Sequence, residues 1–330
     1  MNGKKRIVWA VIGAGNVCEI KSAPAMNALP GSRIKTVMRR NAEKAADYAK
    51  RHNIENWTTD VNAIMNDSEI DIVYIATPPD THAYYTSLAA AAGKAVYVEK
   101  PMANTYAECL SMIEVCKKHN VPLFVAYYRR TLPGFLKVKE LVDSGILGEI
   151  RLISIEMFQP LQPDLIAQAE TNWRVNPAVA GGGYFHDLAS HQLDYLDFVF
   201  GSVAEVKGIS ANQANQYTAD DVVVASFKFQ NGVIGSGVWC FTTDRKSEKD
   251  EIKIVGSKGQ LSFNSFGDPM IVNIKADGME QIISYSHKQP IQTPLIQMII
   301  DSLQSGSVCV STGDTAARTT KIMDQIVCGG

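Results

Sequence analysis

The chain has 330 residues, of which 46% are hydrophobic and 20% charged, enough apolar material for two globular domains. Its 32 basic and 34 acidic residues give a formal net charge of −2, which argues against a nucleic-acid or membrane-surface partner. No apolar run is long enough to cross a bilayer.

The first third of the chain alternates between strand-like and helix-like segments. Strands are predicted at Arg6–Ile12, Arg33–Met38, Ile70–Thr77, Ala95–Val98 and Pro122–Tyr127. Helices are predicted at Asn16–Ala28, with a kink or loop near Pro24, and at Ala42–His52, His82–Ala92 and Tyr106–His119. This alternation predicts right-handed βαβ units and a doubly wound parallel sheet covered on both faces, the α/β class.

The pattern then changes to strands without intervening helices. Helices are expected at Leu132–Ser144 and Tyr184–Phe200, and strands at Ile150–Met157, Val203–Ser210, Asp221–Phe229, Val233–Thr242 and Glu251–Val255. Asn231-Gly232 predicts a tight hairpin turn between two of these strands. We therefore expect domains at residues 1–126 and 127–330, the second being α+β with a mainly antiparallel sheet. Two terminal helices, Pro294–Leu303 and Thr315–Val327, can pack on either domain.

The six cysteines are scattered, with no CxxC pair and no histidine at ligand spacing. This distribution argues against a disulfide framework and against a metal site. It fits a reducing compartment, so we expect a cytoplasmic protein.

A glycine motif follows the first predicted strand. Gly13, Gly15, Asn16 and Val17 form its Gly-x-Gly turn and the start of a helix, as in dinucleotide-binding fingerprints. The third fingerprint position, usually Gly or Ala, is Cys18. The alternative is an ordinary strand-to-helix turn, but the βαβ context favours a dinucleotide.

Two arginines end the second predicted strand. NAD-binding domains usually carry a carboxylate there for the ribose 2′-hydroxyl, whereas this chain has Arg39 and Arg40. A guanidinium can bind a 2′-phosphate, so we prefer NADP over NAD. The alternative is that both arginines are solvated surface charges.

Three further motifs carry a family resemblance. Thr77-Pro78-Pro79 with His82, then Glu99-Lys100-Pro101, then Gly181-Gly182-Gly183 before Asp187, His191 and Asp194 stand in this order. Together they resemble the family of glucose–fructose oxidoreductase, inositol dehydrogenases and MocA-like proteins over nearly the whole chain. Trp173-Arg174 looks most similar to its sugar reductases, such as the 1,5-anhydrofructose reductases.

The resemblance implies a Rossmann domain followed by a domain whose open sheet forms homodimers or homotetramers. It places Lys100, Asp187 and His191 at the nicotinamide and the substrate. It also implies that the cofactor is contacted or flanked by Thr77, Pro78, His82, Glu99, Lys100, Arg129, Trp173 and Arg174. Substrate-binding candidates are Lys100, Tyr128, Trp173, Asp187 and His191.

The residues themselves suit hydride transfer to or from a sugar, cyclitol or related polyol. Oxidation of an alcohol releases a proton that the protein must accept, and histidine titrates nearest the working pH. Asp187 and His191, four apart in an expected helix, should face the same side, while Lys100 follows a strand end. Taken separately, an aspartate and a histidine four residues apart are more often an ordinary pair on a helix surface. A lysine before a proline is more often a solvated loop residue.

The sequence leaves two other functions open. The first is a glycosidase, since some relatives in this family use bound NAD to cleave glycosides without net redox change. The second is a sensor that binds the dinucleotide without catalysis. An acidic or phosphorylated substrate is also possible, since Arg129, Arg130 and Arg174 could bind its negative charge.

Overall fold

The computed structural model describes residues 6–166 and 172–328. Contacts divide the chain into two compact units. The first ends at Tyr128 and resumes over Lys288–Ala317; the second comprises Arg129–His287 and the chain from Arg318 onward. This differs from the expected ranges of 1–126 and 127–330, because a C-terminal segment returns to the first unit.

The first unit holds a six-stranded sheet. Its strands are β1 (Ile7–Ile12), β2 (Ser32–Met38), β3 (Asn56–Thr58), β4 (Ile72–Ile75), β5 (Ala95–Val98) and β6 (Leu123–Val125). They lie in the order β3-β2-β1-β4-β5-β6 and every neighbouring pair is parallel. This doubly wound order is that of a Rossmann domain and confirms the expected fold.

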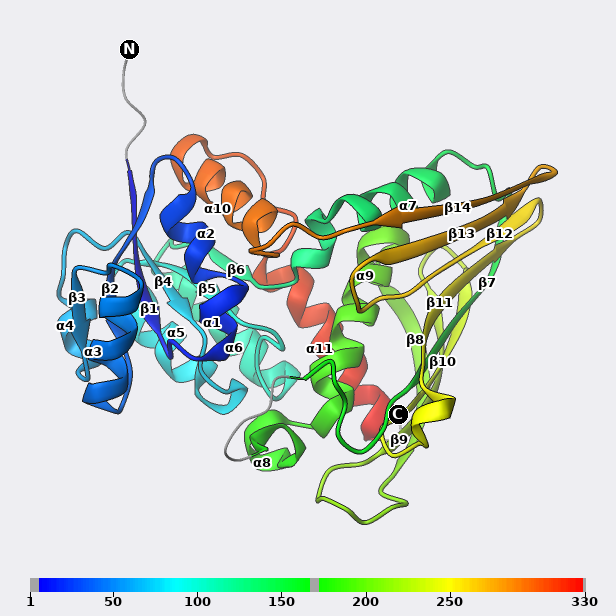
Figure 1. The fold of residues 1–330 in the computed structure, drawn as a ribbon, viewed down its shortest axis with the longest axis horizontal. Helices are drawn as coiled ribbons and strands as arrows, with labels where there is room; N and C mark the ends of the chain where they lie inside the picture. The colour runs from blue at the N-terminus through cyan, green and yellow to red at the C-terminus, as the bar shows by residue number, and fades with distance from the viewer. Residues whose placement is uncertain (1–5, 167–171, 329–330) are drawn as a thin grey trace. The chain divides into compact units, whose positions relative to one another are not determined.

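Helices cover both faces of this sheet. They are α1 (Asn16–Ile20), α2 (Ala23–Ala28), α3 (Ala42–Arg51), α4 (Val61–Met65), α5 (His82–Ala91), α6 (Tyr106–Lys118) and α10 (Thr293–Ser305). One face joins Val73 and Val96 to Met112 of α6 in a buried apolar core. The other face carries Tyr74 and Tyr97, whose stacked rings lie 4.8 Å apart between centroids. α2 and α10 lie side by side (Figure 1).

The interruption predicted near Pro24 in the Asn16–Ala28 segment is confirmed, because this segment forms two helices. The backbone N–H of Lys21 donates to the Val17 carbonyl at 2.9 Å as α1 ends, and Pro24 lies in the first turn of α2. Proline fits that position because a first-turn N–H has no helical acceptor. β3 and α4 were not predicted, since three and five residues carry too little periodicity.

The C-terminal segment is attached to the first unit by hydrogen bonds beside β6. Ser311 Oγ donates to the Val125 carbonyl at 2.7 Å, and the Ser311 carbonyl accepts from Val125 N–H at 3.3 Å. These bonds explain why the segment belongs to this unit, although it follows the second unit in sequence.

The second unit is built on an eight-stranded sheet. Its strands are β7 (Ile150–Phe158), β8 (Val203–Ala211), β9 (Val222–Phe229), β10 (Ile234–Cys240), β11 (Lys249–Gly256), β12 (Gly259–Phe263), β13 (Met270–Ala276) and β14 (Met279–Tyr285). Their order is β14-β13-β12-β11-β7-β10-β9-β8. β7 and β10 are parallel and the other neighbours antiparallel, which confirms the mainly antiparallel sheet. The prediction stopped at β11 and missed the last three strands.

One face of this sheet is buried and the other is exposed. Along β9, Val223, Ala225 and Phe227 are buried, whereas Val224 is 43% exposed. Helices α7 (Pro133–Asp143) and α9 (Ser190–Phe200) lie on one side of the sheet (Figure 1). The β9–β10 hairpin is confirmed, with Gly232 at φ +90° and Phe229 N–H donating to the Val233 carbonyl at 2.8 Å.

Two further helices are the short α8 and the 15-residue α11. α8 is Pro177–Ala180, and α11 is Gly313–Val327, which begins in the first unit and continues into the second from Arg318. Within the described ranges, no helix has both the length and the apolar character that crossing a membrane requires.

Candidate functional site

The cofactor candidates of the first unit follow the carboxyl ends of its parallel strands. Gly13 follows β1, Arg39 follows β2, Thr77 follows β4 and Lys100 follows β5. β1 and β4 are neighbours at the centre of the sheet, where the strand order reverses. Ligands of doubly wound sheets bind at this edge. The fold therefore brings these dispersed residues to one edge.

The glycine turn after β1 fits a dinucleotide. Gly13 has φ +84°, and a Cβ there would lie 2.7 Å from Thr77 Cγ2, so no L-side chain fits. A Cβ added at Gly15, by contrast, would meet only the Gly13 carbonyl oxygen among the described atoms, at 3.8 Å. Packing within the protein explains why residue 13 is glycine, but it does not explain why residue 15 is glycine. Close approach of a pyrophosphate to the backbone would explain the second.

Cys18 occupies the third fingerprint position as a packed side chain. It is fully buried, and the carbonyl oxygen of Cys18 accepts a hydrogen bond from Tyr48 Oη at 3.0 Å. Burial raises the pKa of the Cys18 thiol to about 12, so the thiol stays protonated and unreactive. Cysteine therefore replaces the usual small residue here without a chemical role.

Arg39 and Arg40 lie beyond the end of β2. Arg40 is exposed and Arg39 partly buried. Neither guanidinium forms an ion pair with another residue in the described part of the chain. Their charges are thus not neutralised within the fold. This agrees both with binding of a 2′-phosphate and with two solvated surface arginines.

His82 connects two of the strand-end turns. Its ring is fully buried, with Nε2 2.8 Å from the Thr77 carbonyl oxygen and Nδ1 3.1 Å from the Met102 carbonyl oxygen. Burial lowers the pKa of His82. The imidazole thus ties the turn after β4 to the turn after β5, and Pro78 lies within the first of these turns.

Glu99 is a buried carboxylate directly before Lys100. Its Oε1 accepts from Tyr74 Oη at 2.6 Å and from Gln292 Nε2 at 2.8 Å, and its Oε2 accepts from the Lys100 backbone N–H at 3.2 Å. Three donors therefore replace the water that a buried carboxylate loses. This arrangement fixes the main chain from which the Lys100 side chain extends.

Gln292 reaches this carboxylate from the C-terminal segment. Its side chain is fully buried, and Oε1 accepts from Tyr97 Oη at 2.7 Å. Its backbone N–H donates to the Lys21 carbonyl at 3.0 Å, at the end of α1. Gln292 thereby links the Lys100 turn to the helix that follows the glycine turn, a role that sequence analysis missed.

In the second unit, the glycine run leads into an unexpected helical turn. Gly183 has φ +70°, and a Cβ there would lie 2.5 Å from Ala219 Cβ, so this run is closely packed. Phe185–Ala189 is a π-helical turn, and α9 begins only at Ser190. Residues 184–200 are therefore helical, as predicted, but the helix contains a π-turn. Four-residue spacing alone no longer places Asp187 and His191 on one side, because a π-turn bonds i to i+5.

Asp187 is paired with an arginine that the sequence also selected. Arg174 Nε donates to Asp187 Oδ2 at 3.0 Å, and the two side chains are only 14% and 16% exposed. The same guanidinium lies 4.5 Å from the centroid of the Trp173 ring. The fold thus brings Trp173, Arg174 and Asp187 into one cluster.

His191 and Arg129 meet a common neighbour that the sequence did not suggest. His191 is 3% exposed, and its ring lies edge-on to Phe266 with centroids 5.8 Å apart. The Arg129 guanidinium lies 4.2 Å from the Phe266 centroid, and Arg129 Nε donates to the Ser265 carbonyl at 2.8 Å. Tyr128, which ends the N-terminal segment of the first unit, is buried.

Arg130 does not fit a role in substrate binding. It is buried, and its Nη2 donates to Asp194 Oδ1 at 2.8 Å and Asp197 Oδ2 at 3.1 Å. Asp197 also accepts from Arg318 Nη2 at 2.6 Å. Burial raises the pKa of Asp194 to about 6. Arg130 therefore balances buried carboxylates instead of facing an acidic ligand.

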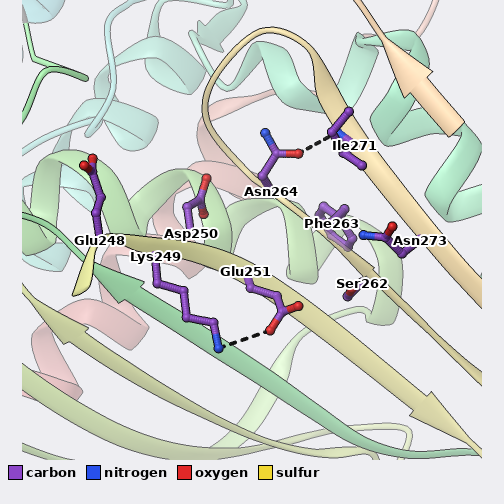
Figure 2. Close-up of a pocket in the computed structure, with 9 residues that line it drawn as sticks. All are labelled: Glu248, Lys249, Asp250, Glu251, Ser262, Phe263, Asn264, Ile271 and Asn273. Atoms are coloured by element: carbon purple, nitrogen blue, oxygen red, sulfur yellow. Dashed lines mark hydrogen bonds and ion pairs between the residues drawn. The ribbon is translucent and has the colours of Figure 1, made fainter. Parts of the chain in front are cut away.

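A groove of about 370 Å³ lies on the second unit. It is lined by Glu248, Lys249, Asp250, Glu251, Ser262, Phe263, Asn264, Ile271 and Asn273. Figure 2 shows Lys249 and Glu251 directed to the same side, 3.4 Å apart in an ion pair. None of the sequence-predicted site residues lines this groove.

Comparison with known proteins decides the family. Residues 7–127 match the model described as the oxidoreductase family with an NAD-binding Rossmann fold, and residues 135–262 match the GFO/IDH/MocA C-terminal domain. Over 326 residues the chain is 39% identical to oxidoreductase P35 of Formosa agariphila, covering 99% of each protein. The chain belongs to the GFO/IDH/MocA oxidoreductase family.

Two other proteins are similar to this chain. The 1,5-anhydro-D-fructose reductase of Ensifer adhaerens is 29% identical over 257 residues, which are 77% of this chain and 74% of that protein. Levoglucosan dehydrogenase in complex with NADH and L-sorbose has the same fold, with a TM-score of 0.84 and 22% identity over 97% of this chain and 96% of that one. The expected family, the expected oxidoreductase class and a nicotinamide cofactor are confirmed.

The roles of individual residues stay predictions. Lys100 belongs to the first unit and Asp187 and His191 to the second, so their action on one substrate is a prediction. Sequence analysis missed Gln292 and Phe266, since neither lies in a motif. A polar residue opening a helix pattern was the only signal for Gln292.

Proposed function

We propose that this chain transfers a hydride between NADP(H) and a hydroxyl-bearing carbon of a sugar, cyclitol or related polyol. The observation that carries the proposal is a GFO/IDH/MocA C-terminal domain in which His191 is buried and Asp187 is paired with Arg174. Relatives named as sugar dehydrogenases or reductases support the substrate class.

His191 has the main acid–base role in this proposal. When an alcohol is oxidised, its carbon loses a hydride and its oxygen loses a proton, which the imidazole of His191 accepts. Lys100 binds the reacting oxygen through its ammonium group and shares the proton relay. Asp187 accepts hydrogen bonds from substrate hydroxyls, with Trp173 and Tyr128 packing against the sugar. Reduction runs through the same residues in reverse.

The nicotinamide accepts or supplies the hydride when it is bound. The residues proposed to hold the dinucleotide are Gly13, Gly15, Asn16, Val17, Arg39, Arg40, Thr77, Pro78, His82, Glu99, Lys100, Arg129, Trp173 and Arg174. We favour NADP over NAD because two guanidinium groups follow β2 where NAD-binding domains usually carry a carboxylate.

We further propose a homodimer or homotetramer formed through the open face of the second unit's sheet. This face exposes Leu152 to 43%, Ile209 to 78%, Ile234 to 53% and Ile282 to 69%. An apolar surface of this kind is typical of a protein interface. Six free cysteines in the described ranges suit a reducing compartment, and we propose the cytoplasm.

The test has two steps. Thermal-shift titrations with NADP and NAD identify the cofactor, and nicotinamide absorbance is then followed during a screen of sugars, cyclitols and polyols. A lasting absorbance change with at least one polyol is the expected result. Hydrolysis of a glycoside without lasting redox change would instead identify a glycosidase, and cofactor binding without any turnover would identify a sensor.

A further inference from the structure

A buried polar cluster surrounds the side chain next to His191. Gln192 is fully buried, and its Oε1 accepts from Trp239 Nε1 at 2.7 Å. Its Nε2 donates to Ser265 Oγ at 2.7 Å and to Asp250 Oδ1 at 3.3 Å. The residue that follows His191 is therefore fixed by β10, by β11 and by the loop after β12.

Asp250 holds that loop by its carboxylate. Oδ1 accepts from Ser265 Oγ at 2.5 Å, and Oδ2 accepts from the Phe266 backbone N–H at 2.6 Å. Figure 2 shows Asp250 directed away from the side taken by Lys249 and Glu251, as alternation along a strand requires. A carboxylate can accept both bonds at once, whereas a neutral amide of the same size offers one oxygen.

The loop in turn contacts two predicted site residues. The Phe266 ring has the Arg129 guanidinium 4.2 Å from its centroid and the His191 ring edge-on at 5.8 Å, with an interplanar angle of 76°. The Ser265 carbonyl accepts from Arg129 Nε at 2.8 Å. One loop, anchored by one carboxylate, therefore restrains both Arg129 and His191.

We propose that Asp250 and Phe266 are positioning residues that hold His191 in its working orientation. The proposal rests on the hydride-transfer function proposed above. Proton transfer requires the imidazole nitrogen within hydrogen-bond reach of the substrate oxygen, and a freely rotating ring spends little time there. An edge-on aromatic contact restricts ring rotation, and the Asp250 bonds fix the backbone that carries Phe266.

The activity test uses Asp250→Asn, Phe266→Leu and Phe266→Tyr. Asp250→Asn and Phe266→Leu are expected to lower kcat about tenfold or more, because the imidazole is no longer held. Phe266→Tyr keeps the aromatic edge and should retain most of the wild-type kcat. Glu251→Gln is the matched control, an adjacent carboxylate-to-amide change on the other side of the same strand, and should leave kcat unchanged.

A second measurement does not depend on turnover. Diethyl pyrocarbonate modifies accessible imidazoles, and peptide mass spectrometry reports its rate at each histidine. His191 is 3% exposed and should react slowly in the wild type. In Asp250→Asn and Phe266→Leu we expect modification of His191 to be about tenfold faster, through local opening of the loop. The rate at His82, buried in the first unit, should not change.

The outcomes separate this proposal from the proposed function. Wild-type rates of His191 modification and wild-type kcat in Phe266→Leu would overturn the positioning role, as would equal acceleration at His191 and His82. If Asp250→Asn does not fold, the Phe266→Leu and Phe266→Tyr pair decides. If the wild type turns over no polyol, the hydride-transfer function fails, while the modification rates still decide whether the loop holds His191.

Discussion

Gln292 Nε2 donates to Glu99 Oε1 at 2.8 Å, although 193 residues separate the two in sequence. The bond joins the segment that returns from the second unit to the turn that carries Lys100. Because the Gln292 backbone N–H also donates to the Lys21 carbonyl, one residue joins the Lys100 turn to the end of the helix that follows the glycine turn.

Replacing Gln292 with methionine should destabilise the first unit. The change keeps the volume but leaves the Tyr97 hydroxyl and the Glu99 carboxylate each short of a buried partner, at a cost of about 1–3 kcal/mol. Urea unfolding measures this loss. Gln297→Met, in the helix that Gln292 precedes, is the control, because Gln297 is only partly buried and its replacement should cost little stability. Equal stability of the two variants would contradict the prediction.

The two glycines of the β1 turn should respond differently to alanine. Gly13→Ala meets Thr77 at 2.7 Å with φ +84° and should lose about 1–3 kcal/mol of stability. Gly15→Ala meets no such obstacle, so it should fold like the wild type but bind the dinucleotide at least about tenfold more weakly. Calorimetric titration and thermal unfolding measure both effects. If Gly15→Ala bound the dinucleotide with wild-type affinity, the pyrophosphate would not lie against this turn.

Arg39 and Arg40 should select NADP. Arg39→Ala and Arg40→Ala are expected to weaken NADP binding about tenfold or more, through loss of charge-assisted bonds to the 2′-phosphate, and to leave NAD binding unchanged. Dissociation constants for both nucleotides measure the effect. Arg33→Ala is the control, because Arg33 on β2 is paired with Glu55 at 2.8 Å. Equal weakening of NAD and NADP would refute the selective role.

Loss of the proposed proton-transfer groups should lower turnover strongly. His191→Ala and Lys100→Met should each reduce kcat about 10²-fold or more, because acid–base catalysis contributes at least that factor. Arg174→Leu should also lower turnover, since it leaves Asp187 without its 3.0 Å ion pair. Arg245→Leu, which breaks the exposed pair with Asp164 in the same unit, serves as the control. A variant with wild-type kcat would exclude that residue from the mechanism.

Glu19 should make stability fall at acidic pH. Its carboxylate bonds Arg51 and His52, which hold its pKa at about 2 instead of 4.5. The pKa is lowered by folding, so the stabilisation is complete above about pH 4.5 and is lost as pH falls towards 2. Allowing for solvent screening, it amounts to roughly 1–2 kcal/mol.

Urea unfolding of wild type and Glu19→Gln across this range measures the contribution of Glu19. The difference between the two proteins should be largest near neutral pH and should vanish near pH 2. Glu55→Gln, whose side chain is 58% exposed, is the control and should show a much smaller difference. A difference that does not depend on pH would contradict the linkage.

The periodic helices and strands were predictable because the pattern that indicates each one lies within a short stretch of sequence. β5 was predicted at its observed bounds, and β1 and α3 within one residue, since apolar runs and helical periodicity are local signals. The positions of the glycines, Thr77 and Lys100 relative to the predicted strands were also enough to place them at strand ends. Short elements such as β3 and α4 escaped, because three to five residues hold no usable period.

The sequence by itself determined the Rossmann unit, the mainly antiparallel second sheet and the residues expected to carry the chemistry. Only the tertiary structure decided how those residues are held: Asp187 by Arg174, His191 by Phe266, and Glu99 by Gln292 from the far end of the chain. It also removed Arg130 from the candidates by burying it with two aspartates. These contacts join residues between 13 and 193 positions apart, and their geometry depends on packing that no local pattern encodes.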